Sequence, residues 1–178
     1  MVNLFTKCEK LDCKPYVTSE NPFQFSDIRG DFVKFFEAKD DSVVIKEAFY
    51  TFTKSGFIRG MHLQVGPGAS SRHIFIKSGS VHTAFIDLRA TSPSYLHVCE
   101  FVTPALTQRR FFVPPGVAHG FQAISDCEII YISDKRYSPN YDTGINPKSI
   151  NVSWSAPVTG LSDRDSNLPD LESFLKLY

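Results

Sequence analysis

The chain has 178 residues, and its 19 basic and 19 acidic side chains leave no formal net charge. This length is enough for one well-buried core and short for two, so we expect a single domain over residues 1–178. Balanced charge lacks the basic field of a protein that binds nucleic acid or a membrane surface, so the expected partner is a small molecule. The sequence has no apolar run of the roughly 18 residues that a membrane span needs, and we expect a soluble, cytoplasmic protein.

Four cysteines are spread along the chain without any Cys-x-x-Cys pair: Cys8, Cys13, Cys99 and Cys127. Cys99 and Cys127 lie within predicted strands, where neither a disulfide framework nor a zinc site is expected. We therefore predict that all four are reduced thiols.

Aromatic and β-branched residues, interrupted by Gly, Pro, Ser and Asp, are typical of strands. In chain order the predicted strands are 31–38, 42–53, 56–64, 72–79, 80–88, 95–102, 108–115, 119–125, 127–134 and 150–154. Gly79 predicts a hairpin turn between two of them, and only residues 168–178 have the apolar spacing of a short helix. Many short antiparallel strands predict an all-β sandwich or jelly-roll barrel with a cavity between its sheets.

The predicted strand 56–64, GFIRGMHLQ, carries Arg59 and His62 among apolar neighbours. Strict alternation would place these two side chains on opposite faces of the strand. A glycine inside a strand often marks a bulge, so we predict one at or near Gly60 that brings both side chains to one face. The alternative is that Arg59 lies at a solvent-exposed edge and His62 is a hydrogen-bonded core residue.

A second motif, FVPPGVAHGF at residues 112–121, combines a Pro-Pro-Gly turn with His119 at the start of the next strand. Its Pro-x-Gly-x-x-His pattern resembles the second half of the cupin signature, a double-stranded β-helix family whose members often bind a metal there. His62, Gln64 and His119 make a poor ligand set, because glutamine is a weak ligand for transition metals. We predict no metal, and a metal-dependent cupin isomerase or dioxygenase stays the alternative.

The same residues can serve chemistry without a metal. A neutral histidine held by a carboxylate can act as a general base near neutral pH. Arg59 could stabilise a developing oxyanion, and Arg72 could do the same or bind a phosphate through two hydrogen bonds.

Several motifs together resemble one family. RGMHLQ, FIDLRATSPSY, FFVPPGVAHGF, EIIYISDKRYSPNYDTGI and LSDRD match, in order and spacing, the family of dTDP-4-dehydrorhamnose 3,5-epimerase, and DIRGDF at residues 27–32 matches its N-terminal motif. The resemblance runs from about residue 27 to residue 165. It implies a cupin-like jelly roll with short peripheral helices, no cofactor, and a homodimer with strands exchanged between the chains.

The resemblance also implies an activity. Family members invert C5, C3 or both in a nucleotide-diphosphate-linked 4-keto-6-deoxy sugar, in deoxysugar biosynthesis. Carried over by position, the base is His62, its carboxylate partner is Asp165 and the acid is Tyr131, with Tyr137 as a rival. The substrate contacts expected from the motifs and the strand positions are Arg29, Arg59, Arg72, His119, Gln64, Thr51, Asp142 and Arg164.

The chain also departs from the family. Arg72 stands where the family usually has Lys, and the two cations are not equivalent at a close contact. The family's Asn-x-Ser stretch is replaced by FYTFT, which leaves only the hydroxyls of Thr51 and Thr53. These changes leave open whether dTDP, GDP or CDP is carried and which centre is inverted, and a sugar-nucleotide 3,4-ketoisomerase remains a further alternative. For single residues, Tyr131 as a core tyrosine, Asp165 as a cap and Arg29 as an exposed turn residue also remain open.

Overall fold

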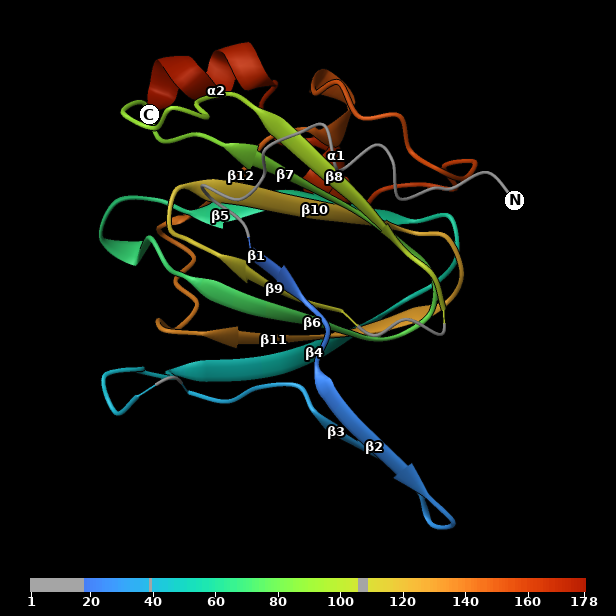
Figure 1. Cartoon of the computed structure of the whole chain (residues 1–178). Coiled ribbons are helices and arrows are strands. Elements are labelled where there is room, and N and C mark those ends of the chain that lie inside the picture. The colour runs from blue at the N-terminus through green and yellow to red at the C-terminus, as the bar shows by residue number, and fades with distance from the viewer. Residues whose placement is uncertain (1–17, 39, 106–108) are drawn as a thin grey trace.

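The computed structural model describes residues 18–38, 40–105 and 109–178, which form two five-stranded antiparallel sheets that face each other (Figure 1). The first sheet has the order β1 (Thr18–Glu20), β9 (Arg109–Val113), β6 (Arg72–Ser78), β11 (Cys127–Ser133) and β4 (Glu47–Thr53). The second has the order β12 (Asp142–Gly144), β5 (Ile58–Gln64), β10 (Val117–Ala123), β7 (Val81–Asp87) and β8 (Val98–Thr103). Apart from β7 and β8, which follow one another in the chain, neighbouring strands in each sheet come from distant parts of the chain, as in a jelly roll.

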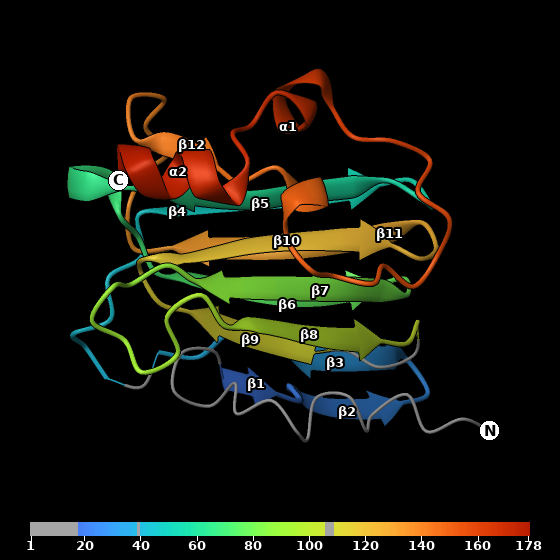
Figure 2. The ribbon, with the colours of Figure 1, turned by 90° about the horizontal axis from the view of Figure 1, so that it is seen from above.

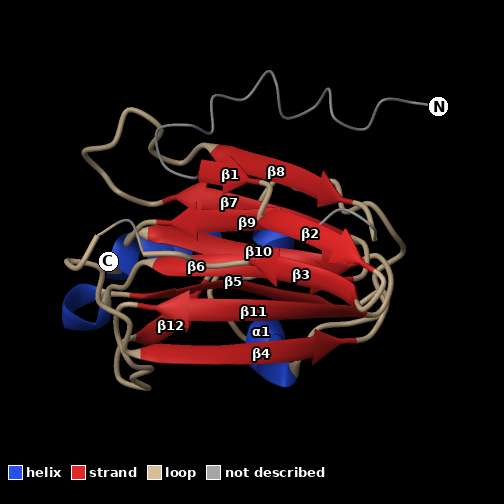
Figure 3. Cartoon of the chain, turned by 60° about the horizontal axis from the view of Figure 1, so that its bottom comes forward, coloured by secondary structure: helices blue, strands red, loops and turns tan. Residues whose placement is uncertain are grey.

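A separate two-stranded ribbon projects away from the two sheets (Figure 1). It consists of β2 (Phe23–Asp27) and β3 (Gly30–Lys34), joined by a tight turn. The helical elements are short and peripheral (Figure 3): η2 (Gly66–Gly68), η3 (Pro147–Ser149), α1 (Asp163–Ser166) and α2 (Leu171–Leu177). The prediction of an all-β, cupin-like jelly roll with short peripheral helices is confirmed.

The second sheet is covered on both faces, which explains why β7 and β10 are buried along their whole length. Its inner face packs against the first sheet through residues such as Phe85, Phe111 and Phe121. Its outer face packs against the C-terminal segment and α2, which lie over it (Figure 2). The chain after β12 is therefore part of the core, and Phe174 of α2 is 3% exposed there.

Predicted and observed elements differ in a few places. Residues 150–154 do not form a strand, because their alternating apolar side chains pack on the outer face of the second sheet without pairing to it. The short strands β1, β2 and β12 and the helix α1 were not predicted, since three to five residues carry too little periodicity to identify an element. The C-terminal helix is confirmed as α2.

The cysteines correct one prediction. Cys127 is a free, buried thiol as expected, and burial raises its pKa to about 11. Cys99 is disulfide-bonded, so the prediction of a reduced thiol is wrong for this residue; Cys8 and Cys13 lie outside the described residues. Pairing depends on the approach of two Cα atoms in space, which sequence spacing does not reveal.

Within the described ranges, no helix combines the length and the apolar character that crossing a membrane would require. The cytoplasmic location stays a prediction.

The packing of α2 on the second sheet can be tested with Phe174→Ala. We expect the variant to lower the free energy of unfolding by about 3 kcal/mol, because it removes a buried aromatic side chain and leaves a cavity. Urea denaturation measures the change. Leu177→Ala in the same helix, where the side chain is 69% exposed, should change stability by less than about 0.5 kcal/mol; equal effects of the two substitutions would contradict the proposed packing.

Candidate active site

A cavity of about 270 Å³ opens between the inner faces of the two sheets. The first sheet contributes Thr51, Arg72, Tyr131 and Ser133 to its wall, and the second contributes Arg59, His62, Gln64 and His119. Tyr137, Asp142 and Arg164, which lie in or beyond the connection that follows β11, also line the cavity. All predicted site residues except Arg29 and Asp165 therefore line one pocket.

The bulge predicted at Gly60 is present and decides which side chains of β5 enter the pocket. In the pairing of β5 with β10, His62 lies opposite His119 and Arg59 lies opposite Phe121, so β5 has one residue more than its partner between these two pairs. As a result Arg59 and His62 both line the pocket.

Gly60 itself has a φ of 124°, and an added Cβ there would lie 2.4 Å from the Cα of Gly120. Only glycine fits this position, both for its backbone conformation and for the close approach of β10.

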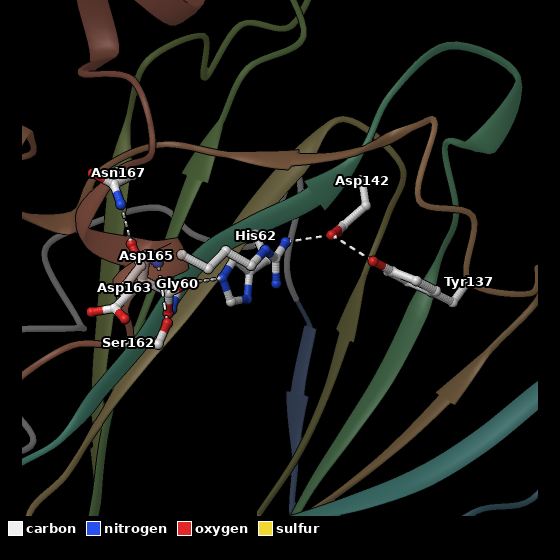
Figure 4. Close-up of polar contacts among 9 residues, drawn as sticks. Gly60, His62, Tyr137, Asp142, Ser162, Asp163, Asp165 and Asn167 are labelled. Carbon is white, nitrogen blue, oxygen red and sulfur yellow. Dashed lines mark hydrogen bonds and ion pairs between the residues drawn. The ribbon is translucent and has the colours of Figure 1, made fainter.

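His62 contacts Asp165 at 2.6 Å between Nε2 and Oδ1 (Figure 4). The second carboxylate oxygen accepts a hydrogen bond from the amide of Gly60 at 3.1 Å. Asp165 is 2% exposed and lies in α1, whose N-cap Ser162 accepts a hydrogen bond from the Asp165 amide. The carboxylate that partners His62 is thus held by both backbone and side-chain contacts.

The electrostatics of this pair favour an ionised carboxylate. Burial raises the pKa of Asp165, but hydrogen bonds from His62 and the Gly60 amide lower it by more, so the pKa lies below its ordinary value. An ionised carboxylate at this distance can accept a hydrogen bond from Nε2 of His62. Because Nε2 is engaged with Asp165, Nδ1 is the ring nitrogen left to take a proton.

Tyr131 enters the pocket from the first sheet, across from His62 on the second. It is 6% exposed, and burial raises its pKa above the ordinary value, an effect that the nearby Arg72 partly offsets. The phenol therefore keeps its proton at neutral pH. Tyr137, the rival acid, is 57% exposed and donates its hydroxyl to Asp142 at 3.3 Å.

Two guanidinium groups line the pocket without a carboxylate partner among the described residues. Arg72 faces the cavity, where burial lowers its pKa while Tyr131 and Asp142 act in the opposite direction. Arg59 donates from Nε to the hydroxyl of Thr53 at 2.8 Å, a neutral acceptor. Uncompensated positive charge in a partly buried pocket favours an anionic ligand.

Buried polar atoms without partners gather around the same cavity. In the part of the chain that the structure describes, His119 Nε2, Thr51 Oγ1 and Ser70 Oγ lack hydrogen-bond partners, and all three residues line the pocket. Burial, together with the charges of Arg72 and His62, lowers the pKa of His119 well below its ordinary value, so it is neutral. Since buried polar groups normally find partners, three unpaired atoms around one cavity indicate a polar ligand.

Sequence reasoning missed Ser70, Phe49 and Glu47, which also line the pocket. Ser70 lies in the loop that departs from the family pattern, and Phe49 lies in the stretch FYTFT that replaces Asn-x-Ser. Both departures were visible in the sequence, but neither showed which side chain of the stretch would face the cavity.

The mouth of the pocket is held by contacts among residues that were predicted to bind substrate. Asp142 forms an ion pair with Arg164, so these two charges neutralise each other. Gln64 accepts a hydrogen bond from the amide of Ser138 at 2.7 Å and donates a longer one to the Arg136 carbonyl. Its amide therefore positions the loop that carries Tyr137.

Arg29 lies at the tip of the projecting ribbon and outside the pocket of its own chain. Its side chain is 83% exposed and paired with Asp27. Within one chain the structure does not bring Arg29 to the other site residues, and its role stays a prediction.

No group of three or more His, Cys, Asp or Glu side chains is arranged to hold a metal ion within residues 18–38, 40–105 and 109–178.

Comparison with known proteins gives consistent results. A family model described as dTDP-4-dehydrorhamnose 3,5-epimerase matches residues 15–173. The chain is 32% identical over 162 residues to the dTDP-4-dehydrorhamnose 3,5-epimerase of Shigella flexneri, and the alignment covers 86% of this chain and 90% of the relative.

Solved structures show the same architecture. A dTDP-4-dehydrorhamnose 3,5-epimerase from Bacillus anthracis, with TDP and PPi bound, matches with a TM-score of 0.78 at 29% identity, over 87% of this chain and 94% of that chain. A 4-keto-6-deoxy sugar epimerase from the novobiocin biosynthetic gene cluster of Streptomyces spheroides matches with a TM-score of 0.84 at 24% identity, over 90% and 85% of the two chains. The second likeness shows a shared fold.

The pairing of Asp165 can be tested by the pH dependence of stability. Asp165→Asn is expected to lower the free energy of unfolding at pH 7 by about 1–3 kcal/mol, because it weakens two buried hydrogen bonds. The pKa of Asp165 is lower in the folded chain, so its stabilising contribution is complete above the ordinary carboxyl pKa of about 4 and is lost as the pH falls further. Wild type and variant should therefore converge in stability below about pH 4.

Urea denaturation at a series of pH values measures this convergence. Asp163→Asn, an exposed neighbour in α1, serves as the matched control and should not reproduce it. A stability difference for Asp165→Asn that stays constant from pH 7 to the acid limit would contradict the depressed pKa.

Proposed function

The chain belongs to the dTDP-4-dehydrorhamnose 3,5-epimerase family, and on that premise we propose that it epimerises a nucleotide-diphosphate-linked 4-keto-6-deoxy sugar without a metal or other cofactor. The observation that carries this proposal is the placement of the His62–Asp165 pair and Tyr131 on opposite walls of one pocket. A carbon atom of a substrate bound between these groups can lose a proton to one wall and gain a proton from the other.

The first step removes a proton from carbon. A ketone at C4 acidifies the hydrogens on C3 and C5, and Nδ1 of His62 takes one of them while the electron pair of the C–H bond moves to the C4 oxygen. Asp165 stabilises the resulting imidazolium, and Arg72 or Arg59 stabilises the enolate oxygen. Cations already placed where negative charge develops need no rearrangement during the reaction.

The second step returns a proton to the opposite face of the sugar ring. The O–H bond of Tyr131 breaks as the new C–H bond forms, the ketone is restored, and the centre is inverted. The tyrosinate that remains takes a proton from water, which its raised pKa favours, and the His62 imidazolium gives up its proton to water, so both groups return to their starting states.

The nucleotide is proposed to be dTDP. Support comes from the Bacillus anthracis relative, whose structure holds TDP and PPi, and from the relatives named for dTDP-linked substrates. Relatives include both 3,5-epimerases and a 3-epimerase, so the centre that is inverted is to be read from the product. Such a product belongs to deoxysugar biosynthesis for a cell-surface polysaccharide or an antibiotic.

Solvent exchange tests the function. In D2O the wild-type protein should incorporate deuterium at C5, C3 or both of dTDP-4-keto-6-deoxyhexose, as read by NMR, and His62→Asn should lower that rate by about 10²-fold or more. His97→Asn, outside the pocket, should leave the rate unchanged. A His62→Asn variant that exchanges as fast as wild type would refute the mechanism, and a wild type that exchanges no dTDP, GDP or CDP substrate would refute the function.

The projecting ribbon supports a proposed homodimer. Phe25, Phe32 and Ile28 are 54%, 57% and 105% exposed on β2, β3 and their turn, and a two-stranded ribbon is marginally stable alone in water. We propose that the ribbon of each chain packs on a second copy and delivers Arg29 to that copy's pocket. This explains why Arg29 lies outside the pocket of its own chain.

Oligomeric state tests this arrangement. Sedimentation equilibrium at micromolar concentration should give twice the chain mass, and Phe25→Asp with Phe32→Asp should shift the protein towards monomer because buried charge opposes the contact. Asp31→Asn on the same ribbon is the control and should leave the mass unchanged. A wild-type monomer over this range would reject the exchange.

A further inference from the structure

We propose that Phe49 is a positioning residue for Tyr131 and thereby sets how much of the deprotonated substrate is inverted rather than returned unchanged. The inference rests on the proposed function, in which Tyr131 is the proton donor. Phe49 lines the pocket in a stretch where the chain departs from the family pattern.

The two rings are stacked across neighbouring strands. Phe49 of β4 and Tyr131 of β11 are direct partners in the antiparallel register, with ring centroids 4.9 Å apart and ring planes at 12°. This separation is within the range of favourable aromatic pairs. The cross-strand partner on the other side of Tyr131 is Ile74 of β6, which is 1% exposed. Tyr131 is therefore flanked in the sheet by a fully packed aliphatic residue and by Phe49.

Phe49 is the flanking residue that faces open space. Among the residues that the structure describes, β4 is the last strand of the first sheet, and no strand beyond it there supports Phe49. Phe49 is 44% exposed while Tyr131 is 6% exposed, so Phe49 is the more exposed ring of the stacked pair. Removing that ring would give the tyrosine ring room to move and would admit water beside its hydroxyl.

The enolate can be protonated by His62 or by Tyr131, and movement of Tyr131 affects only the second reaction. After its Nδ1 proton has exchanged with solvent, the His62 imidazolium can reprotonate the face from which it took the proton, which restores the starting sugar with a solvent hydrogen at that carbon. Tyr131 can instead protonate the opposite face, which gives the epimer. Because misplacement by about 1 Å can cost on the order of 10²-fold in rate, a displaced Tyr131 slows inversion while deprotonation by His62 continues.

The experiment measures the ratio of deuterated starting sugar to epimer in D2O, by NMR of the same reaction mixture. Phe49→Leu is expected to raise this ratio by about tenfold, a partial loss of the positioning effect. Phe49→Tyr keeps an aromatic ring in the stack and should restore the wild-type ratio. If Phe49→Leu does not fold, Phe49→Met removes the ring with a flexible side chain of similar volume and is used instead.

Tyr50→Leu is the matched control, since Tyr50 is the next residue on β4, is 70% exposed and is absent from the pocket lining. It should leave the ratio unchanged. An unchanged ratio in Phe49→Leu, or an equal rise in Tyr50→Leu that signals general loosening of β4, would overturn the inference. A wild type that shows no exchange at all would instead reject the proposed function, so the two failures are distinct.

Discussion

The carboxylate of Asp165 is the contact on which the pocket depends, because it binds β5 on both sides of the bulge. One oxygen bonds His62 and the other accepts from the amide of Gly60, so a single side chain holds the base and the backbone distortion that aims it. Asp165 is buried, and removing one of its partners would leave a charge poorly compensated. The C-terminal segment that carries Asp165 is in turn held to the second sheet by apolar packing. Apolar packing outside the pocket therefore helps to fix the position of His62, because it holds the segment that carries Asp165.

The pocket is suited to an anionic, hydroxyl-rich ligand. Arg72 has no carboxylate partner among the described residues, and three buried polar atoms around it lack hydrogen bonds. Each unsatisfied buried group costs on the order of 1–3 kcal/mol. A nucleotide-linked sugar offers phosphate, hydroxyl and ketone oxygens to these same groups. Asp142 and Arg164, by contrast, satisfy each other in an ion pair, and this contact shapes the mouth of the pocket.

Burial explains which parts of the fold could be predicted. The patterns of β5, β6, β7 and β11 were identified because each strand has at least one face in a packed core. Residues 150–154 show the same alternation, but their apolar side chains cover a sheet rather than join it. Periodicity reports which side chains are buried and not which backbone groups are paired. This is why 150–154 was mistaken for a strand and why the three-residue β12 was missed.

The sequence by itself determined the fold class, the bulge at Gly60 and most of the polar groups in the pocket, because these follow from local pattern and from motifs in a matching order. Only the tertiary structure decided which of those groups meet. His62 and Asp165 are separated by 103 residues, and their contact requires the C-terminal segment to cross the second sheet. Arg29 lies outside the pocket of its own chain. The side-chain amide of Gln64 is hydrogen-bonded to the loop that carries Tyr137, and Phe49 stacks on Tyr131. Such outcomes depend on strand register and side-chain packing across the whole domain, and these are set by the sum of distant contacts rather than by any local stretch.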